Sequence, residues 1–207
     1  MKTKFNTKSL VLLGMLTALV MVFSFTPIGS IPIGDLSITL NIIPIAIAAV
    51  ALGPVGGAVI GAVFGIFSFL QCFGIGIPSG LGAICLEISP VLTFLQRFVP
   101  RVLDGLLVGF IFRFVSSKFN VHTASFVTGF FAAFLNTAFF MSALVLLFRN
   151  SDYMVESMAG RSAIAYILAS VGINAVFEMI ASTVITGAVG LALYKAKFIQ
   201  LPQEQTA

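Results

Sequence analysis

The sequence predicts an all-α integral membrane protein, in which residues 1–207 form a single domain of six transmembrane helices with structured outer loops. Composition is the first reason: 59% of the residues are hydrophobic and 9% are charged, whereas soluble domains carry about 25% charged residues. The second reason is a series of apolar runs close to the length of about 20 residues that crosses a bilayer core as a helix. The third is that basic residues gather in segments that would share one side of the membrane.

The apolar runs are separated by polar links or by segments rich in glycine and proline, which mark the ends of helices. The first run follows basic residues and lacks the small-residue cleavage pattern of a signal peptide, so we interpret it as a retained helix. We expect Pro44 to kink the second helix and Gly53-Pro54 to form a tight turn before the third. The predicted spans are residues 9–25, 36–52, 55–70, 96–115, 123–148 and 161–193.

Two irregular segments, residues 26–35 and 71–95, combine apolar side chains with several glycines and prolines. We expect both to be ordered loops, the second with short helical pieces that lie partly within the protein, where backbone polar groups find partners. Residues 116–122 and 149–160 are predicted to be a short polar link and a polar loop. With six spans, both irregular segments fall on one side of the membrane, which suggests a pocket open to that side.

The charge distribution predicts the orientation. If both termini are cytoplasmic, that side has seven basic residues and one acid, a balance of +6, and the rest has four basic residues and six acids, a balance of −2. The positive-inside rule therefore places both termini on the cytoplasmic side of the cell membrane and the irregular segments outside. The cytoplasmic set is Lys2, Lys4, Lys8, Arg113, Lys118, Lys195, Lys197 and Glu204. The remaining set is Arg97, Arg101, Arg149, Arg161, Asp35, Glu87, Asp104, Asp152, Glu156 and Glu178.

Several function classes are excluded by what the sequence lacks. The single His122, with Cys72 and Cys85 outside metal-ligand spacing, predicts no metal site. The sequence has no phosphate-binding loop motif and no visible set of nucleophile and base, so we expect no enzyme activity and no cofactor. The net charge of +4 is small and dispersed, which argues against nucleic acid as a partner. Whether Cys72 and Cys85 form a disulfide stays open.

Small residues recur one helical turn apart in two predicted spans. Glycines occupy every fourth position from Gly53 to Gly65, which lets another helix approach closely, and we interpret this stripe as packing within the bundle. Gly14 and Ala18 repeat the spacing in the first span. They could serve internal packing or form a docking surface for a second membrane protein.

Two arginines lie one turn apart near the start of the fourth predicted span. Arg97 and Arg101 share one face of the helix, and Asp104 lies three residues beyond Arg101. A charge inside a membrane faces a partner or a cavity. One interpretation is that Arg101 and Asp104 only neutralise each other. The other is that an arginine presents its fork of donors to an anionic ligand, which the surplus positive charge favours.

Three more polar residues lie deep in apolar spans. Asn136 is in the middle of the fifth span, and Asn174 and Glu178 lie one turn apart near the centre of the sixth. Buried amide and carboxyl groups without partners are costly, so these side chains either bind one another or line a ligand pocket with an apolar wall. Glu178 could alternatively be a proton-coupling acid.

A combination of motifs runs along nearly the whole chain, from about Lys8 to Lys197. The motifs are Phe25-Thr26-Pro27-Ile28-Gly29, Ile31-Pro32-Ile33-Gly34, Thr39, Ala51-Leu52-Gly53-Pro54, Arg101-Val102-Leu103-Asp104-Gly105 and Asn136-Thr137. Together they resemble the substrate-binding S components of energy-coupling-factor (ECF) vitamin transporters. The resemblance implies six helices that bind a vitamin or its precursor from outside with high affinity.

The resemblance also implies partners: a transmembrane coupling protein and two ATPase subunits, with the S component toppling in the membrane to release its cargo. Gly14 and Ala18 correspond to the small residues with which the family docks. The loop and Asn-Thr patterns look most like the pantothenate-specific members, which implies Arg101 or Arg97 for the vitamin's carboxylate and Asn136 for its amide or hydroxyls. Biotin, riboflavin and folate are alternative vitamins.

The alternative class is a self-sufficient secondary transporter with Glu178 as its proton site. Many such transporters are built from two inverted halves, and the sequence has no convincing internal repeat.

Overall fold

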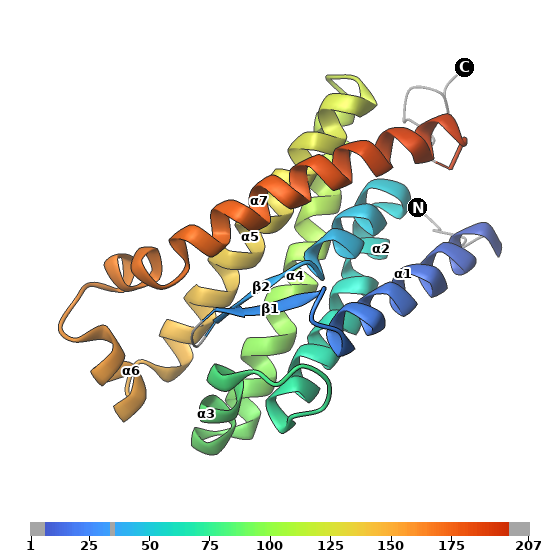
Figure 1. The fold of residues 1–207 in the computed structure, drawn as a ribbon. Coiled ribbons are helices and arrows are strands. Elements are labelled where there is room, and N and C mark those ends of the chain that lie inside the picture. The colour runs from blue at the N-terminus through green and yellow to red at the C-terminus, as the bar shows by residue number, and fades with distance from the viewer. Residues whose placement is uncertain (1–6, 34–35, 199–207) are drawn as a thin grey trace.

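The computed structural model describes residues 7–33 and 36–198, which form a mainly α-helical bundle with one β-hairpin (Figure 1). Four residues of the charge balance, Lys2, Lys4, Asp35 and Glu204, lie outside the described residues, as does Gly34. The elements in chain order are α1 (Thr7–Phe25), β1 (Ser30–Ile33), β2 (Leu36–Thr39), α2 (Ile42–Leu70), the 3₁₀ helix η1 (Gln71–Phe73), α3 (Gly80–Ile88), α4 (Pro90–Ser116), α5 (Val121–Phe148), α6 (Asp152–Met158) and α7 (Ala163–Lys195).

A β-hairpin occupies the place where the second span was predicted to begin. Strands β1 and β2 pair antiparallel, with Ser30 opposite Thr39 and Ile33 opposite Leu36. The prediction of a helix from residue 36 was therefore wrong, because this segment pairs with the preceding strand and α2 begins only at Ile42. The hairpin crosses the middle of the bundle, and β2 contacts α7 (Figure 1).

Helix α2 is interrupted at Gly53. This residue has φ 75° and ψ −164°, a region of backbone space that is essentially restricted to glycine. The break predicted at Gly53-Pro54 is confirmed, and Figure 1 shows the two arms of α2 running in different directions. The kink predicted at Pro44 was wrong. Pro44 lies in the first turn of α2, where its missing N–H would have had no partner within the helix.

The second arm of α2 packs antiparallel on α4, and glycines make the approach close. A Cβ added at Gly57 would lie 2.2 Å from the carbonyl oxygen of Gly105, and one at Gly61 would lie 2.2 Å from that of Arg101. The glycine stripe is therefore confirmed as packing within the bundle. This contact, the most extensive between any two described elements, fixes the face of α4 that carries the arginines against α2.

Side-chain caps explain where the later helices begin. Each cap accepts a hydrogen bond from the backbone N–H three residues on. The capping residues are Ser79, Ser89, Asn120, Ser151 and Ser162. Ser89 with Pro90 at the first helical position starts α4 earlier than the predicted residue 96, so that boundary was wrong. The predicted short helical pieces within 71–95 are confirmed as η1 and α3, whereas α6 was not anticipated in the 149–160 loop.

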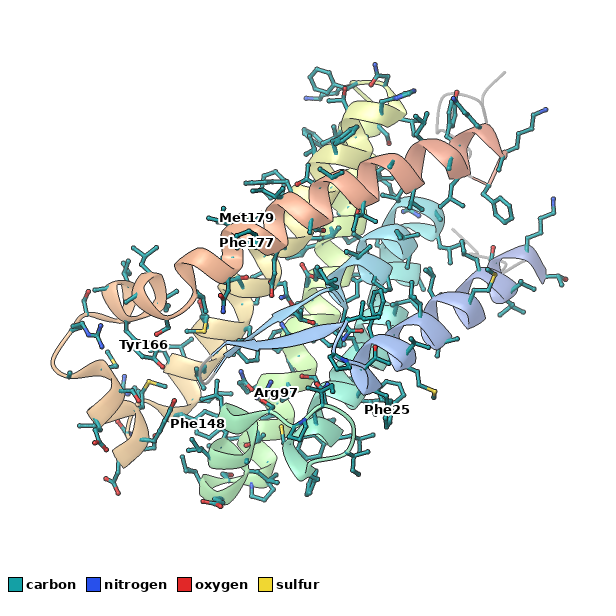
Figure 2. All side chains as sticks on the ribbon, viewed as in Figure 1. Phe25, Arg97, Phe148, Tyr166, Phe177 and Met179 are labelled. Atoms are coloured by element: carbon teal, nitrogen blue, oxygen red, sulfur yellow. The ribbon has the colours of Figure 1, made fainter. Side chains whose placement is uncertain are left out.

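The surface of the bundle fits a lipid environment. Large apolar side chains such as Phe25 and Phe177 lie exposed on the outside of the helices (Figure 2). Four helices among the described residues are long and apolar enough to cross a membrane, which makes this a multi-pass membrane protein: Thr7–Phe25, Ile42–Phe73, Val121–Phe148 and Asn174–Lys195. This count is lower than the predicted six because the two arms of α2 count once and because α4 carries several charges, of which Arg97, Arg101 and Asp104 are buried.

The two ends of the bundle differ in charge. The start of α1, the end of α7 and the connection between α4 and α5 lie at one end, and α3 and α6 lie at the other (Figure 1). Lys8, Lys118 and Lys195 belong to the first end. Of the irregular segments that were predicted to share one side of the membrane, residues 71–95 contain α3 at the opposite end, whereas β1 runs through the middle of the bundle (Figure 1).

Candidate functional site

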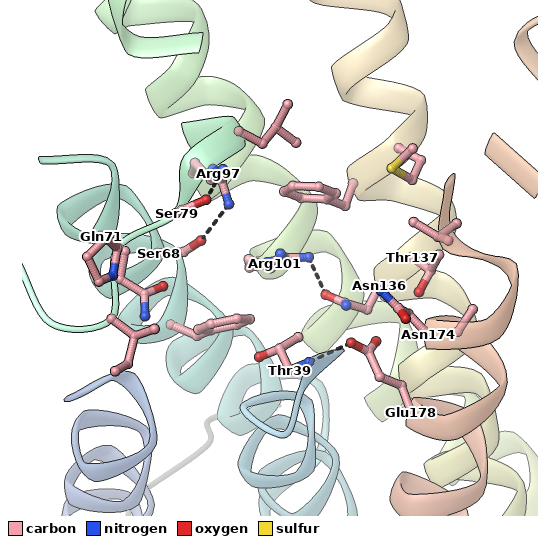
Figure 3. Close-up of a pocket in the computed structure, with 18 residues that line it drawn as sticks. Thr39, Ser68, Gln71, Ser79, Arg97, Arg101, Asn136, Thr137, Asn174 and Glu178 are labelled. Carbon is pink, nitrogen blue, oxygen red and sulfur yellow. Dashed lines mark hydrogen bonds between the residues drawn. The ribbon is translucent and has the colours of Figure 1, made fainter. Parts of the chain in front are cut away.

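A cavity lies between α2, α4, α5 and α7, at the end of β2 and beside the segment that leads into α3 (Figure 3). The space that it encloses, together with the open space at its mouth, comes to about 730 Å³. All five residues predicted to contact a ligand line it: Arg97, Arg101, Asn136, Asn174 and Glu178. The other lining residues are Thr39, Phe64, Ser68, Gln71, Ile77, Pro78, Ser79, Leu81, Thr137, Phe140, Met141, Val171 and Ala175.

Arg101 is held in the interior by one hydrogen bond and by two neighbouring aromatic rings. The side chain is only 4% exposed, and Nη1 donates a hydrogen bond to Oδ1 of Asn136 on α5. The ring centroids of Phe64 and Phe140 lie 4.9 Å and 4.6 Å from Cζ. Such stacking fixes the plane of the fork. Its Nε is buried and has no hydrogen-bond partner among the described residues.

Arg97 lies one turn earlier on α4 and is held by hydroxyl groups. Its Nη2 donates to Oγ of Ser79 at 3.0 Å, and its Nη1 donates to Oγ of Ser68 at 3.5 Å. Ser79 also caps α3, so Arg97 connects that helix to the cavity wall. The Nε of Arg97 is buried and without a hydrogen-bond partner in the part of the chain that the structure describes.

The opposite wall is formed by polar side chains of α5 and α7. The backbone N–H of Thr39, at the end of β2, donates to Oε1 of Glu178 at 2.6 Å, which ties the hairpin to α7. Asn174 lies one turn before Glu178 and lines the same cavity. The two residues are 9% and 5% exposed, respectively. This wall therefore offers carboxyl and amide groups to a ligand.

Asp104 is a buried carboxyl group on α4 that is not among the residues lining the cavity. It is fully buried, and neither of its oxygens has a hydrogen-bond partner within residues 7–33 and 36–198. Arg101 gives its hydrogen bond to Asn136 and not to Asp104, so the two residues do not form a closed, self-neutralising pair. Both Asp104 and Glu178 nevertheless act electrostatically on Arg101.

Sequence reasoning missed the residues that position the arginines. Ser68 and Ser79 were not singled out, although a serine directly before Gly80 is a recognisable helix cap. Gln71 also lines the cavity, and its Nε2 donates to the carbonyl oxygen of Ser24 at the end of α1. Ser68 and Gln71 are three residues apart at the end of an otherwise apolar segment. This spacing places them on one helix face, so the sequence could have identified them as a polar pair.

The small residues of α1 lie on its outer face. Gly14 and Ala18 are both exposed, whereas Leu16 and Val20 are buried against the bundle. No atom of the described chain lies within 4 Å of a Cβ added at Gly14. The alternative in which these residues serve packing within the bundle is therefore excluded for Gly14 in the described structure.

The two cysteines are buried and free. Cys72 is in η1 and Cys85 is in α3, and the structure contains no disulfide between them. Desolvation by burial raises the pKa of the Cys85 thiol to about 11, despite the lowering effect of nearby Arg97. A protonated, buried thiol is a poor nucleophile, so Cys85 is expected to be unreactive.

A bundle with an apolar exterior and a buried polar cavity is the form expected of a membrane protein that binds a small polar molecule. Residues 8–190 match the family described as ECF transporter, substrate-specific component, and the chain belongs to this family. It is thus a component of a transporter and not an enzyme, and the resemblance inferred from the sequence is confirmed.

Two curated relatives are similar over most of their length. The chain is 26% identical over 197 residues to the "Pantothenate transporter PanT" of Leuconostoc mesenteroides, which covers 91% of this chain and 93% of the relative. It is 25% identical over 168 residues to the "Pantothenic acid transporter PanT" of Lactococcus lactis subsp. cremoris, which covers 77% of this chain and 79% of the relative.

Proposed function

We propose that this protein is the high-affinity substrate-binding subunit of an ATP-driven ECF transporter and that its substrate is pantothenate. The observation that carries the proposal is the convergence of two buried arginines with amide, carboxyl and hydroxyl side chains in one cavity. The names of the two relatives support the choice of vitamin.

The chemistry of pantothenate matches the groups available in the cavity. The vitamin has a carboxylate, a central amide and two hydroxyls. Arg97 and Arg101 offer forked, permanently charged donors that suit a carboxylate. Asn136, Asn174 and Glu178 offer donors and acceptors that suit an amide and hydroxyls. Apolar side chains such as Phe140 exclude water and strengthen these polar contacts.

The proposed topology has six membrane segments with both termini in the cytoplasm. The two arms of α2, separated by Gly53, and helix α4 join α1, α5 and α7 to make the six. The basic end of the bundle, with Lys118 and Lys195, faces the cytoplasm under the positive-inside rule. The cavity, next to the hairpin and α3, then opens to the outside, where the vitamin is captured.

The outer face of α1 is the proposed docking surface for the transmembrane coupling protein, which in turn binds two ATPase subunits. Gly14 and Ala18 are exposed on this face, and their small side chains allow a partner helix to approach closely. Because docking and ligand binding use different surfaces, changes at the two sites should have separable effects.

Uptake of radiolabelled pantothenate by cells that express this protein with its partners tests the proposal. We expect uptake to stop when ATP is depleted, to survive collapse of the proton gradient, and to resist excess biotin, riboflavin or folate. Uptake that stops with the proton gradient while ATP remains would instead support a secondary transporter with Glu178 as the proton site. Competition by another vitamin, and not by pantothenate, would reassign the ligand.

A further inference from the structure

The two arginines of the cavity differ in their electrostatic surroundings. The two buried carboxyl groups, Asp104 and Glu178, both act on Arg101. In the described chain Arg97 forms no ion pair, and its hydrogen bonds go to the hydroxyls of Ser68 and Ser79. Two buried acids thus act on Arg101, whereas in the described chain Arg97 is held by the neutral hydroxyls of Ser68 and Ser79.

A buried charge without a counter-charge is costly, and neutral hydroxyls reduce the cost only in part. Arg97 is only 6% exposed, and its Nε has no hydrogen-bond partner among the described residues. The neighbouring charge of Arg101 adds to the positive potential, since the two guanidinium groups act on each other. The end of the cavity next to α3 therefore has a positive potential that favours an anionic group.

The end of the cavity next to α7 has the opposite character. Glu178 presents a carboxyl group that attracts hydroxyl donors and, when ionised, repels a carboxylate. Asn174 lines the same end of the cavity, where its amide can bind a ligand hydroxyl. Figure 3 shows Arg97 with Ser68 and Ser79 on one side of the cavity, Asn174 and Glu178 on the other, and Arg101 between them.

We infer that the cavity binds its ligand in a single orientation, with the carboxylate on Arg97, the amide beside Arg101 and Asn136, and the hydroxyls at Asn174 and Glu178. The order of groups along pantothenate, from carboxylate through amide to hydroxyls, is the order of these side chains across the cavity. The inference rests on the proposed function and assigns different roles to the two arginines: Arg97 selects the acid, and Arg101 supports the middle of the ligand.

The test compares Arg97→Gln with Arg101→Gln, which remove the same charge and keep an amide donor. Dissociation constants are measured on purified protein for pantothenate and for pantothenol, in which an alcohol replaces the carboxylate. We expect Arg97→Gln to reduce the preference for pantothenate over pantothenol by about 30-fold or more. We expect Arg101→Gln to weaken both ligands by a similar factor and to leave the preference intact.

Thermal unfolding in detergent verifies that each variant is folded. If Arg97→Gln does not fold, Arg97→Lys replaces it; this variant keeps the charge but loses the fork, so the preference should fall without vanishing. A preference that collapses in Arg101→Gln alone, that collapses equally in both variants, or that changes in neither overturns the inference. Failure of the unaltered protein to bind pantothenate contradicts the proposed function itself, so the two failures are distinguishable.

Discussion

Gly61 tests whether close helix packing sets the position of Arg101. A Cβ added at Gly61 would lie 2.2 Å from the carbonyl oxygen and 2.9 Å from the carbonyl carbon of Arg101, whereas ordinary contact begins at 3.4 Å. Both groups belong to rigid helices, so Gly61→Ala requires α2 and α4 to separate by roughly 1 Å. The arginine that holds Asn136 across the cavity would move with α4.

The expected cost of this change follows from overpacking. Inserting a methyl group into a tight contact destabilises a protein by about 1–3 kcal/mol. For a chain of this size the corresponding fall in Tm is about 2–12 °C. Because the displaced helix carries both Arg97 and Arg101, we also expect ligand affinity to fall, by about tenfold for each 1.4 kcal/mol of binding energy lost.

Differential scanning fluorimetry in detergent, with and without ligand, measures the loss of stability, and isothermal titration measures the affinity. Gly14→Ala is the matched control. It makes the same chemical change in a helix, but no described atom lies within 4 Å of the added Cβ, so Tm should stay the same or rise. If Gly61→Ala unfolded at the same temperature as the unaltered protein and bound ligand equally well, the packing argument would be refuted.

Three further predictions concern docking, topology and the cavity. Ala18→Leu should abolish transport while leaving ligand affinity of the isolated protein unchanged; an equal loss of affinity would place this face inside the bundle. In intact cells an impermeant thiol reagent should label a cysteine at exposed Asp152 and spare one at exposed Lys118, and the reverse pattern would invert the topology. Arg101→Ala should weaken ligand binding by about 2–5 kcal/mol, measured by titration, whereas Arg149→Ala in its exposed loop should cost about 0–1 kcal/mol. Equal effects of the two changes would remove Arg101 from the site.

The polar residues of the cavity could be predicted from the sequence. A charged or amide side chain within an apolar helix must face a polar partner or a cavity, so such side chains tend to gather at one site. Arg97, Arg101, Asn136, Asn174 and Glu178 come from three helices, and the structure brings all five to one cavity. Their energetic cost in lipid identifies such residues regardless of the fold. The glycine stripe was predictable for a similar reason, since its spacing specifies helix contact directly.

The elements that were missed depend on tertiary contacts. Leu36–Thr39 is apolar enough for a helix, and only its pairing with Ser30–Ile33 makes it a strand. The roles of the two arginines were also hidden, because Ser68 and Ser79 are ordinary serines until folding places them beside Arg97. The start of α4 was missed for a different reason. Ser89-Pro90 is a helix-start signal that is already visible in the sequence, without any tertiary contact.

The most direct test of the account is mass spectrometry of the small molecule that the protein retains after purification from cells grown with several vitamins. The account predicts that denaturing the protein releases pantothenate and that the amount retained falls sharply when Arg97 is replaced by Gln. Release of a different vitamin, or retention of pantothenate that is indifferent to Arg97, would contradict the assignment of the cavity.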